Sequence, residues 1–304
     1  MERINTVPAL GSRGRPLPAL RPVHLSVLSG RTLNLAVPAP RGRGDLGEAV
    51  LVLERGDQQR AVPMEVEPQP DGTVLLTATA SLRHARYDAP EASGPRLTDG
   101  VWRLRVETTD LRGRRSRFGL AATPAHVVDG PTLSSQPSET AGATFRPMRS
   151  VDGQSMIKVV GPRTHAELIG FDLRWDRVSV RGRLIAAGSP PAGFRAEAVR
   201  RGGGATVAVR PQWDGDRFGF DIPLDAMAAR GRGRGMWDVS LRSGRDRIKV
   251  SRKLTDVRHP KKVFRTPFRT IATEGGALLR VHAHLSPAGN LAVSCTVIAT
   301  EETA

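Results

Sequence analysis

Cysteine, aromatic side chains and long apolar runs are scarce in this chain of 304 residues. Its single cysteine, Cys295, excludes a disulfide within the chain. No run of about 18 apolar residues is present, so the sequence predicts no membrane-spanning helix. The first 22 residues contain four prolines and lack the continuous apolar core of a secretory signal. We therefore expect a cytoplasmic protein, or one held peripherally at the inner face of the membrane.

Acidic residues are too few to balance the basic ones, since 46 Lys and Arg face 30 Asp and Glu for a net charge of +16. Only five of the 46 are Lys, a bias typical of a GC-rich genome as much as of a binding surface. The excess gathers between Arg242 and Arg269, where eleven basic residues stand against Asp246 and Asp256. Such a patch can bind a polyanion through phosphate contacts, and a solvated face with no ligand is the alternative. The candidate polyanion contacts are Arg242, Arg245, Arg247, Lys249, Arg252, Lys253, Lys261 and Lys262.

Short runs of alternating apolar and polar residues, bounded by Gly, Pro, Asp and Asn, dominate the pattern. They predict strands at 33–37, 49–53, 73–78, 101–106, 177–184, 206–210, 218–222 and 236–241. Hairpin-type turns are expected at 70–73 and 213–216, where Gly72 and Gly215 tolerate a positive φ. Helix is expected only around 224–229. Many short strands with frequent turns indicate an all-β sandwich.

Three blocks of sequence recur in the same order in the two halves of the chain. The segment DGVWRLRV (99–106) resembles RGMWDVSL (234–241), and similar hairpin patterns precede them at 49–82 and 194–227. Downstream, FRPMR (145–149) and MIKVV (156–160) parallel FRTPFR (264–269) and LLRVH (278–282). The repeat predicts two β-sandwich modules, 20–165 with a flexible loop at 130–143, and 166–295. A flexible N-terminal segment (1–19) and a C-terminal tail (296–304) flank them, and Trp102 and Trp237 are expected to be equivalent core anchors.

Catalytic patterns are missing from the sequence. No Gly-x-Ser-x-Gly turn and no glycine loop opening a helix is found, so neither a serine nucleophile nor a nucleotide site is predicted. Cys295 lies in an apolar strand pattern and is expected to be an inert buried thiol. His282 and His284 are two apart on a predicted strand and could supply two metal ligands from one face, but no nearby Cys, Asp or Glu completes a set. We assign no catalytic residue, cofactor or metal.

Nucleic-acid binding can be judged from the aromatic residues. Single-strand binders interleave aromatics with basic side chains, whereas aromatics are 4% of this chain and the basic stretch 242–262 has none. Finger spacing, an RNP-type strand and a helix-turn-helix are also missing. Sequence-specific recognition of nucleic acid is therefore not expected, and nonspecific attraction stays open.

The segments FDLRWDRVSVRGRL (171–184), TVAVRPQWDGDRFGFDIPL (206–224) and GMWDVSLRSG (235–244) resemble immunoglobulin-like β-sandwich modules of actinobacterial proteins. Those modules accompany glycosyltransferases and CDP-glycerol-type polyol-phosphate transferases of cell-envelope glycopolymer synthesis. The resemblance covers both modules and implies two tandem immunoglobulin-like sandwiches with an accessory role. No catalytic residue is transferred with it.

The sequence and the resemblance together predict a non-catalytic binding protein. It would hold an anionic, teichoic-acid-like glycopolymer or a partner protein, such as a glycosyltransferase or polyol-phosphate transferase, through the basic stretch. Two alternatives from other classes are a transferase-type enzyme with a site between the modules and a nonspecific nucleic-acid binder.

Overall fold

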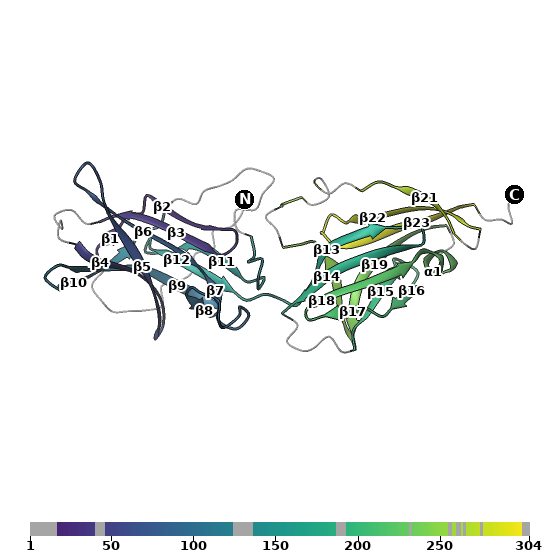
Figure 1. Cartoon of the computed structure of the whole chain (residues 1–304), viewed down its shortest axis with the longest axis horizontal. Coiled ribbons are helices and arrows are strands. Elements are labelled where there is room, and N and C mark those ends of the chain that lie inside the picture. Colours follow the sequence, from purple (N-terminus) through teal and green to yellow (C-terminus); the bar gives the residue numbers. More distant parts are fainter. Residues whose placement is uncertain are drawn as a thin grey trace. The chain divides into compact units, whose positions relative to one another are not determined.

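The computed structural model describes residues 17–39, 46–123, 136–186, 193–230, 233–254, 257–259, 263, 266–273 and 276–299. The chain divides into two compact units, Met1–Pro162 and Arg163–Ala304. In both, nearly all of the regular secondary structure is strand, which confirms the all-β prediction (Figure 1). Among the described residues the helix α1 (Leu224–Ala229) lies where the sequence predicted it.

The first unit contains twelve of the described strands. They are β1 (Ala19–Leu20), β2 (His24–Leu28), β3 (Thr32–Pro38), β4 (Leu46–Arg55), β5 (Gln58–Pro68), β6 (Val74–Ser81), β7 (Arg83–His84), β8 (Arg96–Leu97), β9 (Gly100–Asp110), β10 (Arg115–Leu120), β11 (Thr144–Arg149) and β12 (Ser155–Val160). The long strand β5 pairs with β4 through its first half and with β6 through its second half. It therefore joins one layer, which holds β4, β9, β10 and β12, to a second layer of β6, β3 and β2.

Strand β9 is the centre of the first unit. It pairs with β4 along one edge, and along the other edge its first half pairs with β12 and its second half with β10. The short strand β1 adds to β10 in parallel. Three strands thus pair with β9, and this pairing fixes which of its side chains point to each face of the sheet.

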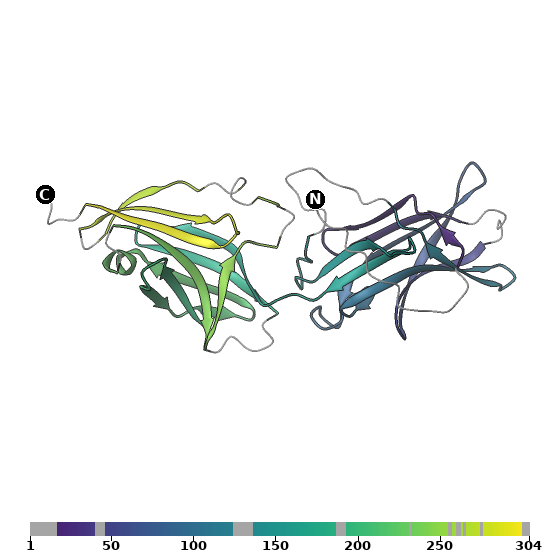
Figure 2. The same ribbon diagram turned by 180° about the vertical axis from the view of Figure 1, so that it is seen from behind.

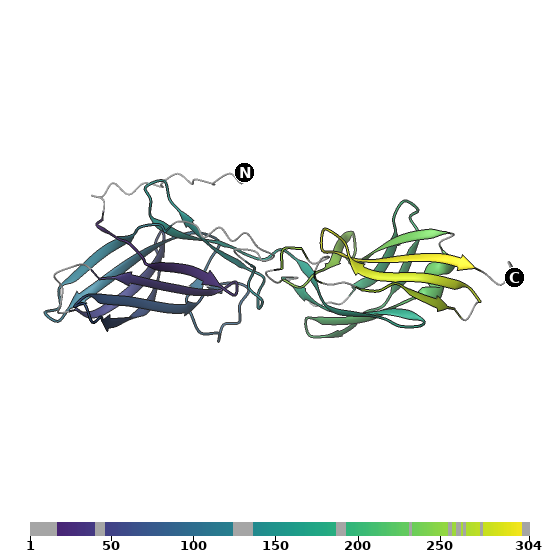
Figure 3. The same ribbon diagram turned by 90° about the horizontal axis from the view of Figure 1, so that it is seen from above.

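The second unit contains the remaining eleven described strands. They are β13 (His165–Leu173), β14 (Arg177–Ile185), β15 (Arg195–Arg200), β16 (Thr206–Val209), β17 (Gln212–Asp214), β18 (Arg217–Pro223), β19 (Arg234–Ser243), β20 (Asp246–Ser251), β21 (Arg269–Ala272), β22 (Leu278–Leu285) and β23 (Leu291–Ala299). Helix α1 follows β18 and is the green coil at one end of this unit in Figure 2. The antiparallel pair β22 and β23, yellow in Figure 3, runs side by side.

Strand β19 has the same set of neighbours as β9. It pairs with β15 along one edge, and along the other edge its first half pairs with β23 and its second half with β20. The start of β13 adds to β20 in parallel, as β1 does to β10. Strands β13, β14 and β18 follow one another, as β2, β3 and β6 do. The two units therefore share the pairing pattern around their central strand.

Alternation of apolar and polar residues along the strands builds a separate core in each unit. The predicted anchors are buried, since Trp102 is 0% and Trp237 1% exposed. The indole Nε1–H of Trp102 donates to the Thr98 carbonyl at 2.9 Å, which satisfies its one polar group. The predicted turns also form, with positive φ at Gly72 (77°) and Gly215 (59°).

The structure corrects several sequence-based expectations. The place of β12 beside the central strand is taken in the second unit by β23, and β22, which carries LLRVH, pairs with β21 and β23 instead. Residues Thr296 to Ala299 of the expected tail continue β23, because they pair with β22. The expected boundary at 165/166 falls one residue inside β13, three residues after the division at Pro162.

The loop expected at 130–143 is described from residue 136 onward, and residues 130–135 lie outside the described part. Ser138, Ala141 and Ala143 are 0%, 5% and 0% exposed, so this part of the loop is packed rather than loose. The Ser138 backbone N–H donates to the Ala143 carbonyl at 2.7 Å, which closes the turn. A composition rich in Ser, Thr and Gly does not reveal such packing, because small side chains are buried without leaving an apolar pattern.

Candidate functional site

The outer face of β19 follows from its alternation. Trp237, Val239 and Leu241 point into the core, so Asp238 and Ser240 belong to the opposite face. The same alternation places Arg242 there. On the neighbouring strands, Glu197 and Val199 of β15 and Arg247 and Lys249 of β20 come to this face through the pairing register, which sets Glu197 and Lys249 on either side of Ser240. We call this the outer face of the second unit.

A buried carboxylate lies in this face between two arginines. Glu197 is 4% exposed, and its two oxygens accept from Arg242 Nη1 at 3.3 Å and from Arg247 Nη2 at 2.9 Å. The arginine side chains are 49% and 45% exposed. Two guanidinium groups thus share one carboxylate and keep an outer side facing solvent. Their pairing contributes little to stability, because solvent screens the charges, but it fixes two cations side by side.

A hollow of about 240 Å³ opens in the same face. Its lining consists of Val199, Arg200, Arg201, Asp238, Ser240, Arg247 and Lys249. Four of these side chains are cationic and one is a carboxylate. The guanidinium of Arg201 donates to Asp238 at 2.6 Å, and this hydrogen bond raises the pKa of Arg201 above its ordinary value.

Ser240 lies in the lining of the hollow with its hydroxyl unused. Its side chain is 2% exposed, and its Oγ has no hydrogen-bond partner among the described residues. A buried hydroxyl without a partner costs about 1–3 kcal/mol. The hollow therefore contains an unsatisfied donor among four cationic side chains and one carboxylate.

The equivalent face of the first unit is neutralised internally. Aligning Trp102 with Trp237 places Arg105 at the position of Ser240, and the strand registers then place Glu54 at the position of Val199. Arg105 and Glu54 form an ion pair at 2.6 Å with side chains 18% and 15% exposed.

The same alignment places the pair Glu107–Arg117, at 2.5 Å, at the position of Arg242 and Arg247. Where the first unit has two carboxylates for two arginines, the second has two arginines and no carboxylate at these four positions. The hollow of the second unit thus occupies the place that the Arg105–Glu54 pair fills in the first.

The eight candidate contacts are distributed unevenly. Arg242, Arg247 and Lys249 come together on the outer face, and Arg245 lies exposed in the turn between β19 and β20. Arg252 serves the chain itself, because its guanidinium donates to the Val257 carbonyl. Lys253 is exposed two residues after β20 ends, and Lys261 and Lys262 lie outside the described residues.

Sequence reasoning missed Glu197, Ser240 and the Arg201–Asp238 pair. The alternation of RAEAVR, with Ala196 and Ala198 inside, could have assigned Glu197 to the outer face. What brings it opposite Ser240 is the register of β15 on β19, which a single sequence does not encode locally.

The structure also shows the positions of His282, His284 and Cys295. His282 and His284 stack at 4.5 Å between ring centroids, which fits their expected position on one face. His282 Nε2 lies 2.8 Å from the Thr266 carbonyl, and no group of three His, Cys, Asp or Glu gathers in the described ranges. Cys295 is 4% exposed, and burial raises the pKa of its thiol to about 11, as an inert thiol requires.

A second buried carboxylate in this unit is fully engaged. Glu167 is 1% exposed, pairs with Arg183 and accepts the Leu254 backbone N–H at 2.8 Å. Next to it on β13, His165 has a pKa lowered chiefly by burial. These groups hold the strands around β13 together.

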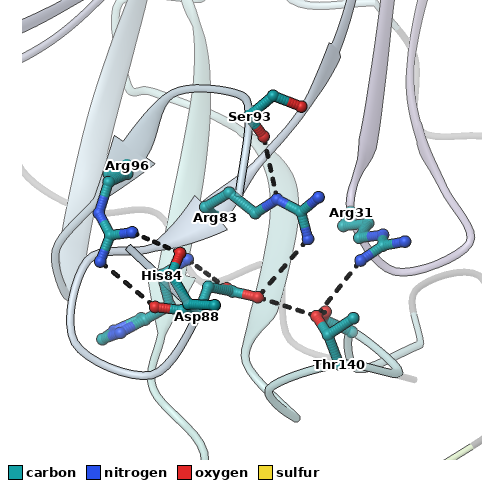
Figure 4. A network of polar contacts seen from close by, with 9 residues as sticks. Arg31, Arg83, His84, Asp88, Ser93, Arg96 and Thr140 are labelled. Carbon is teal, nitrogen blue, oxygen red and sulfur yellow. Dashed lines mark hydrogen bonds and ion pairs between the residues drawn. The ribbon is translucent and has the colours of Figure 1, made fainter. Parts of the chain in front are cut away.

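The first unit has a polar network of its own, drawn in Figure 4. Asp88 is 6% exposed and accepts from the His84 backbone N–H at 2.7 Å and from Thr140 Oγ1 at 2.8 Å. Arg96 donates to the carbonyls of Ala85 and Asp88 at 2.6 and 3.3 Å. The network ties the loop around Thr140 to the segment between β7 and β8, so its role is structural.

Comparisons with known proteins add weak likenesses. No family model and no curated protein matches the chain. A crystal structure of S. aureus TarS covering its residues 217–571 matches 76% of this chain and 61% of its own at 7% identity, with a TM-score of 0.32. A longer S. aureus TarS structure matches 77% of this chain and 38% of its own at 8% identity, with a TM-score of 0.30.

The type I pullulanase of Bacillus subtilis str. 168 in complex with maltose matches 78% of this chain and 25% of its own at 9% identity, with a TM-score of 0.17. This chain thus spans less than two thirds of each of these structures. The described part of the chain contains no helix with the length and apolar character that a membrane crossing requires.

Proposed function

We propose that this chain is a non-catalytic binding protein built from two copies of one immunoglobulin-like β-sandwich module. In this proposal the outer face of the second unit holds an anionic glycopolymer of the polyol-phosphate, teichoic-acid-like class. The contacts are Arg242, Arg245, Arg247 and Lys249, with Lys253 and the two lysines 261 and 262 extending the basic stretch. The predicted location is the cytoplasm or the inner membrane face.

The observation that carries the proposal is the difference in charge at equivalent positions. The first unit pairs Arg117 with Glu107, whereas the second places Arg242 against Arg247 and gives both one shared carboxylate, Glu197. Cations fixed side by side with solvent on their outer side are what a chain of phosphates needs, because each contact releases counterions from the polymer.

A polyol phosphate fits this face better than a nucleic acid does. Single-strand binding relies on aromatic side chains on which bases stack, and none of the seven residues lining the hollow is aromatic. The one apolar residue of the lining, Val199, cannot stack a base. A polymer whose repeating unit is a phosphate on a small polyol requires only the cations.

The test is a binding screen of the full chain against poly(glycerol phosphate), polyphosphate, single-stranded RNA and a neutral glycan at several salt concentrations. The variant carries Arg242→Gln, Arg245→Gln, Arg247→Gln and Lys249→Gln, with its fold checked by circular dichroism. We expect selective binding of the polyol phosphate that weakens as salt rises and is lost in the variant.

Binding that does not respond to salt, or that the variant retains, contradicts the proposal. Equal weak binding to every polyanion would mean that the net positive charge reflects genome composition and not a specific ligand. Absence of binding to all four ligands directs the search to a partner protein instead.

A further inference from the structure

We infer that the hollow at Ser240 is a subsite for one phosphate group of a phosphodiester-linked polyol polymer. The inference rests on the proposed function and adds a definite position for the ligand. A polymer that is attracted only by the net charge of a basic face can bind in many positions along it. A subsite instead holds one phosphate of the polymer at one place on the protein. The two ideas therefore make different predictions for variants of equal net charge.

The groups around the hollow match a phosphate. Arg201, Arg247 and Lys249 line it and supply N–H donors, and Ser240 supplies a hydroxyl. Of these, Arg201 is already held by Asp238 at 2.6 Å and Arg247 by Glu197 at 2.9 Å, so two guanidinium groups are fixed before a ligand arrives. Lys249 is exposed and can turn toward the ligand.

Size also fits. The hollow encloses about 240 Å³, and a liquid water occupies about 30 Å³, so a phosphate group enters together with several waters. A hollow that is open to solvent can hold one phosphate group of a longer polymer, because the rest of the polymer can extend away from it in solvent. A buried, closed cavity would admit only a free ion.

The unused hydroxyl is the independent sign of a ligand. Ser240 is 2% exposed and its Oγ has no partner among the described residues, while the hollow beside it is lined by four cationic side chains and one carboxylate, Asp238. The side chain of Lys249, which lies opposite Ser240 in the register, is exposed and can move aside to open access to the hydroxyl. A phosphate oxygen then accepts the hydroxyl proton in a charge-assisted hydrogen bond and relieves the unpaired donor.

The first unit provides a natural design for closing the hollow. There Glu54 and Arg105 fill the equivalent positions with an ion pair at 2.6 Å. Changing Val199→Glu together with Ser240→Arg transfers this pair to the second unit. One negative and one positive charge are added, so the net charge of the chain, and with it the long-range attraction to a polyanion, is unchanged.

The experiment measures calorimetric binding of glycerophosphoglycerol, a single phosphodiester between two glycerols, and of poly(glycerol phosphate) to the full chain. Sulfate and single-stranded RNA serve as ligand controls. The V199E/S240R variant should bind glycerophosphoglycerol about tenfold or more weakly than the unchanged chain, since hydrogen bonds to charged groups are lost. It should keep the salt dependence of polymer binding.

A second variant, Ser240→Ala, tests the subsite even if the V199E/S240R variant does not fold. It removes the unpaired hydroxyl, so the melting temperature without ligand should stay the same or rise. The rise in melting temperature that glycerophosphoglycerol produces in the unchanged chain should shrink in this variant.

The outcomes separate the two proposals. If both variants bind glycerophosphoglycerol as the unchanged chain does, the subsite is wrong while the basic face can still be right. If sulfate competes equally well, the hollow is a general anion site and the phosphodiester assignment fails. If the four-residue glutamine variant keeps its polymer binding, the proposed function itself fails.

Discussion

The two units of this chain place different side chains on the same part of one strand arrangement. Strands β9 and β19 have the same pattern of neighbours, and both carry a buried tryptophan at the same point. On the opposite face the first unit has the pairs Glu54–Arg105 and Glu107–Arg117, and the second has Glu197 between two arginines beside an open hollow. The core alternation is retained while the outer face differs.

The physical reason is the period of a strand. Successive side chains point to opposite faces, so every second residue is constrained by packing and the others are free to change. Exposed ion pairs on such a face add little stability, so one arrangement of charges can replace another at a small cost in stability. A face of different charge can thus arise on a sheet without disturbance of the core beneath it.

The largest effects are expected where the units are alike. Trp102→Ala and Trp237→Ala each remove a fully buried indole, and we expect each to lower the free energy of unfolding by about 3–5 kcal/mol. Urea unfolding followed by far-ultraviolet circular dichroism measures the loss. A loss below about 1 kcal/mol for either tryptophan would show that the two positions are not equivalent core anchors.

Medium effects are expected from the ion pairs of the first unit. Glu54→Gln leaves the mostly buried Arg105 without its partner and should cost about 1–3 kcal/mol, whereas Glu107→Gln, in a more exposed pair, should cost about 0–1 kcal/mol. Thermal unfolding of the two variants compares them directly. The prediction is that Glu54→Gln destabilises the chain more than Glu107→Gln does. The reverse order would contradict the view that the Glu54–Arg105 pair is the more buried and more important of the two.

A change in affinity of several-fold is expected when the shared carboxylate is removed. Glu197→Val introduces the residue that the first unit has at this position, Val52, and releases Arg242 and Arg247 to bind phosphate. Polymer affinity at fixed salt should rise, and its salt dependence should steepen by about one counterion. Isothermal titration at three salt concentrations measures both. Weaker binding would mean that the positioning of the arginines by Glu197 outweighs the competition of its carboxylate with the phosphates.

The smallest expected effect is a pH dependence of stability from His165. Burial lowers the pKa of His165 below its ordinary 6.5, so the unfolded chain takes up its proton at a higher pH than the folded one. The stabilising contribution is therefore complete above about pH 6.5 and is lost as the pH falls from there toward the folded pKa. Unfolding of the chain and of His165→Asn between pH 7.5 and 5 tests this, and the variant should lose that part of the slope.

Local pattern predicted much of the architecture. The strands, the turns at Gly72 and Gly215, the helix at α1 and the two buried tryptophans depend on alternation and turn chemistry within a few residues. The substitution of β23 for β22 beside β19 was missed, because strand neighbours are chosen by contacts between distant segments.

The site was predicted only in outline for the same reason. A count of basic residues pointed to the hairpin of β19 and β20, but it could not separate Arg242 and Arg247 on the outer face from Arg252, whose guanidinium donates to the Val257 carbonyl. Ser240 gave no signal, since one serine in an alternating strand is ordinary. Its significance depends on the register that leaves its hydroxyl buried and unpaired.

The central claim is that the outer face of the second unit, and not its equivalent in the first, binds an anionic polymer. The most direct test compares two variants with the same loss of charge. One has Arg242, Arg245, Arg247 and Lys249 changed to Gln, and the other has Arg112, Arg114, Arg115 and Arg117 of the β9–β10 hairpin changed to Gln.

Dissociation constants for poly(glycerol phosphate) are measured at fixed low salt for both variants and for the unchanged chain. We predict that the second-unit variant loses at least tenfold in affinity, while the first-unit variant stays within about threefold, because Arg114 and Arg117 each have a carboxylate of their own whereas Arg242 and Arg247 share one. Equal losses in the two variants would contradict the account, since binding would then follow net charge alone.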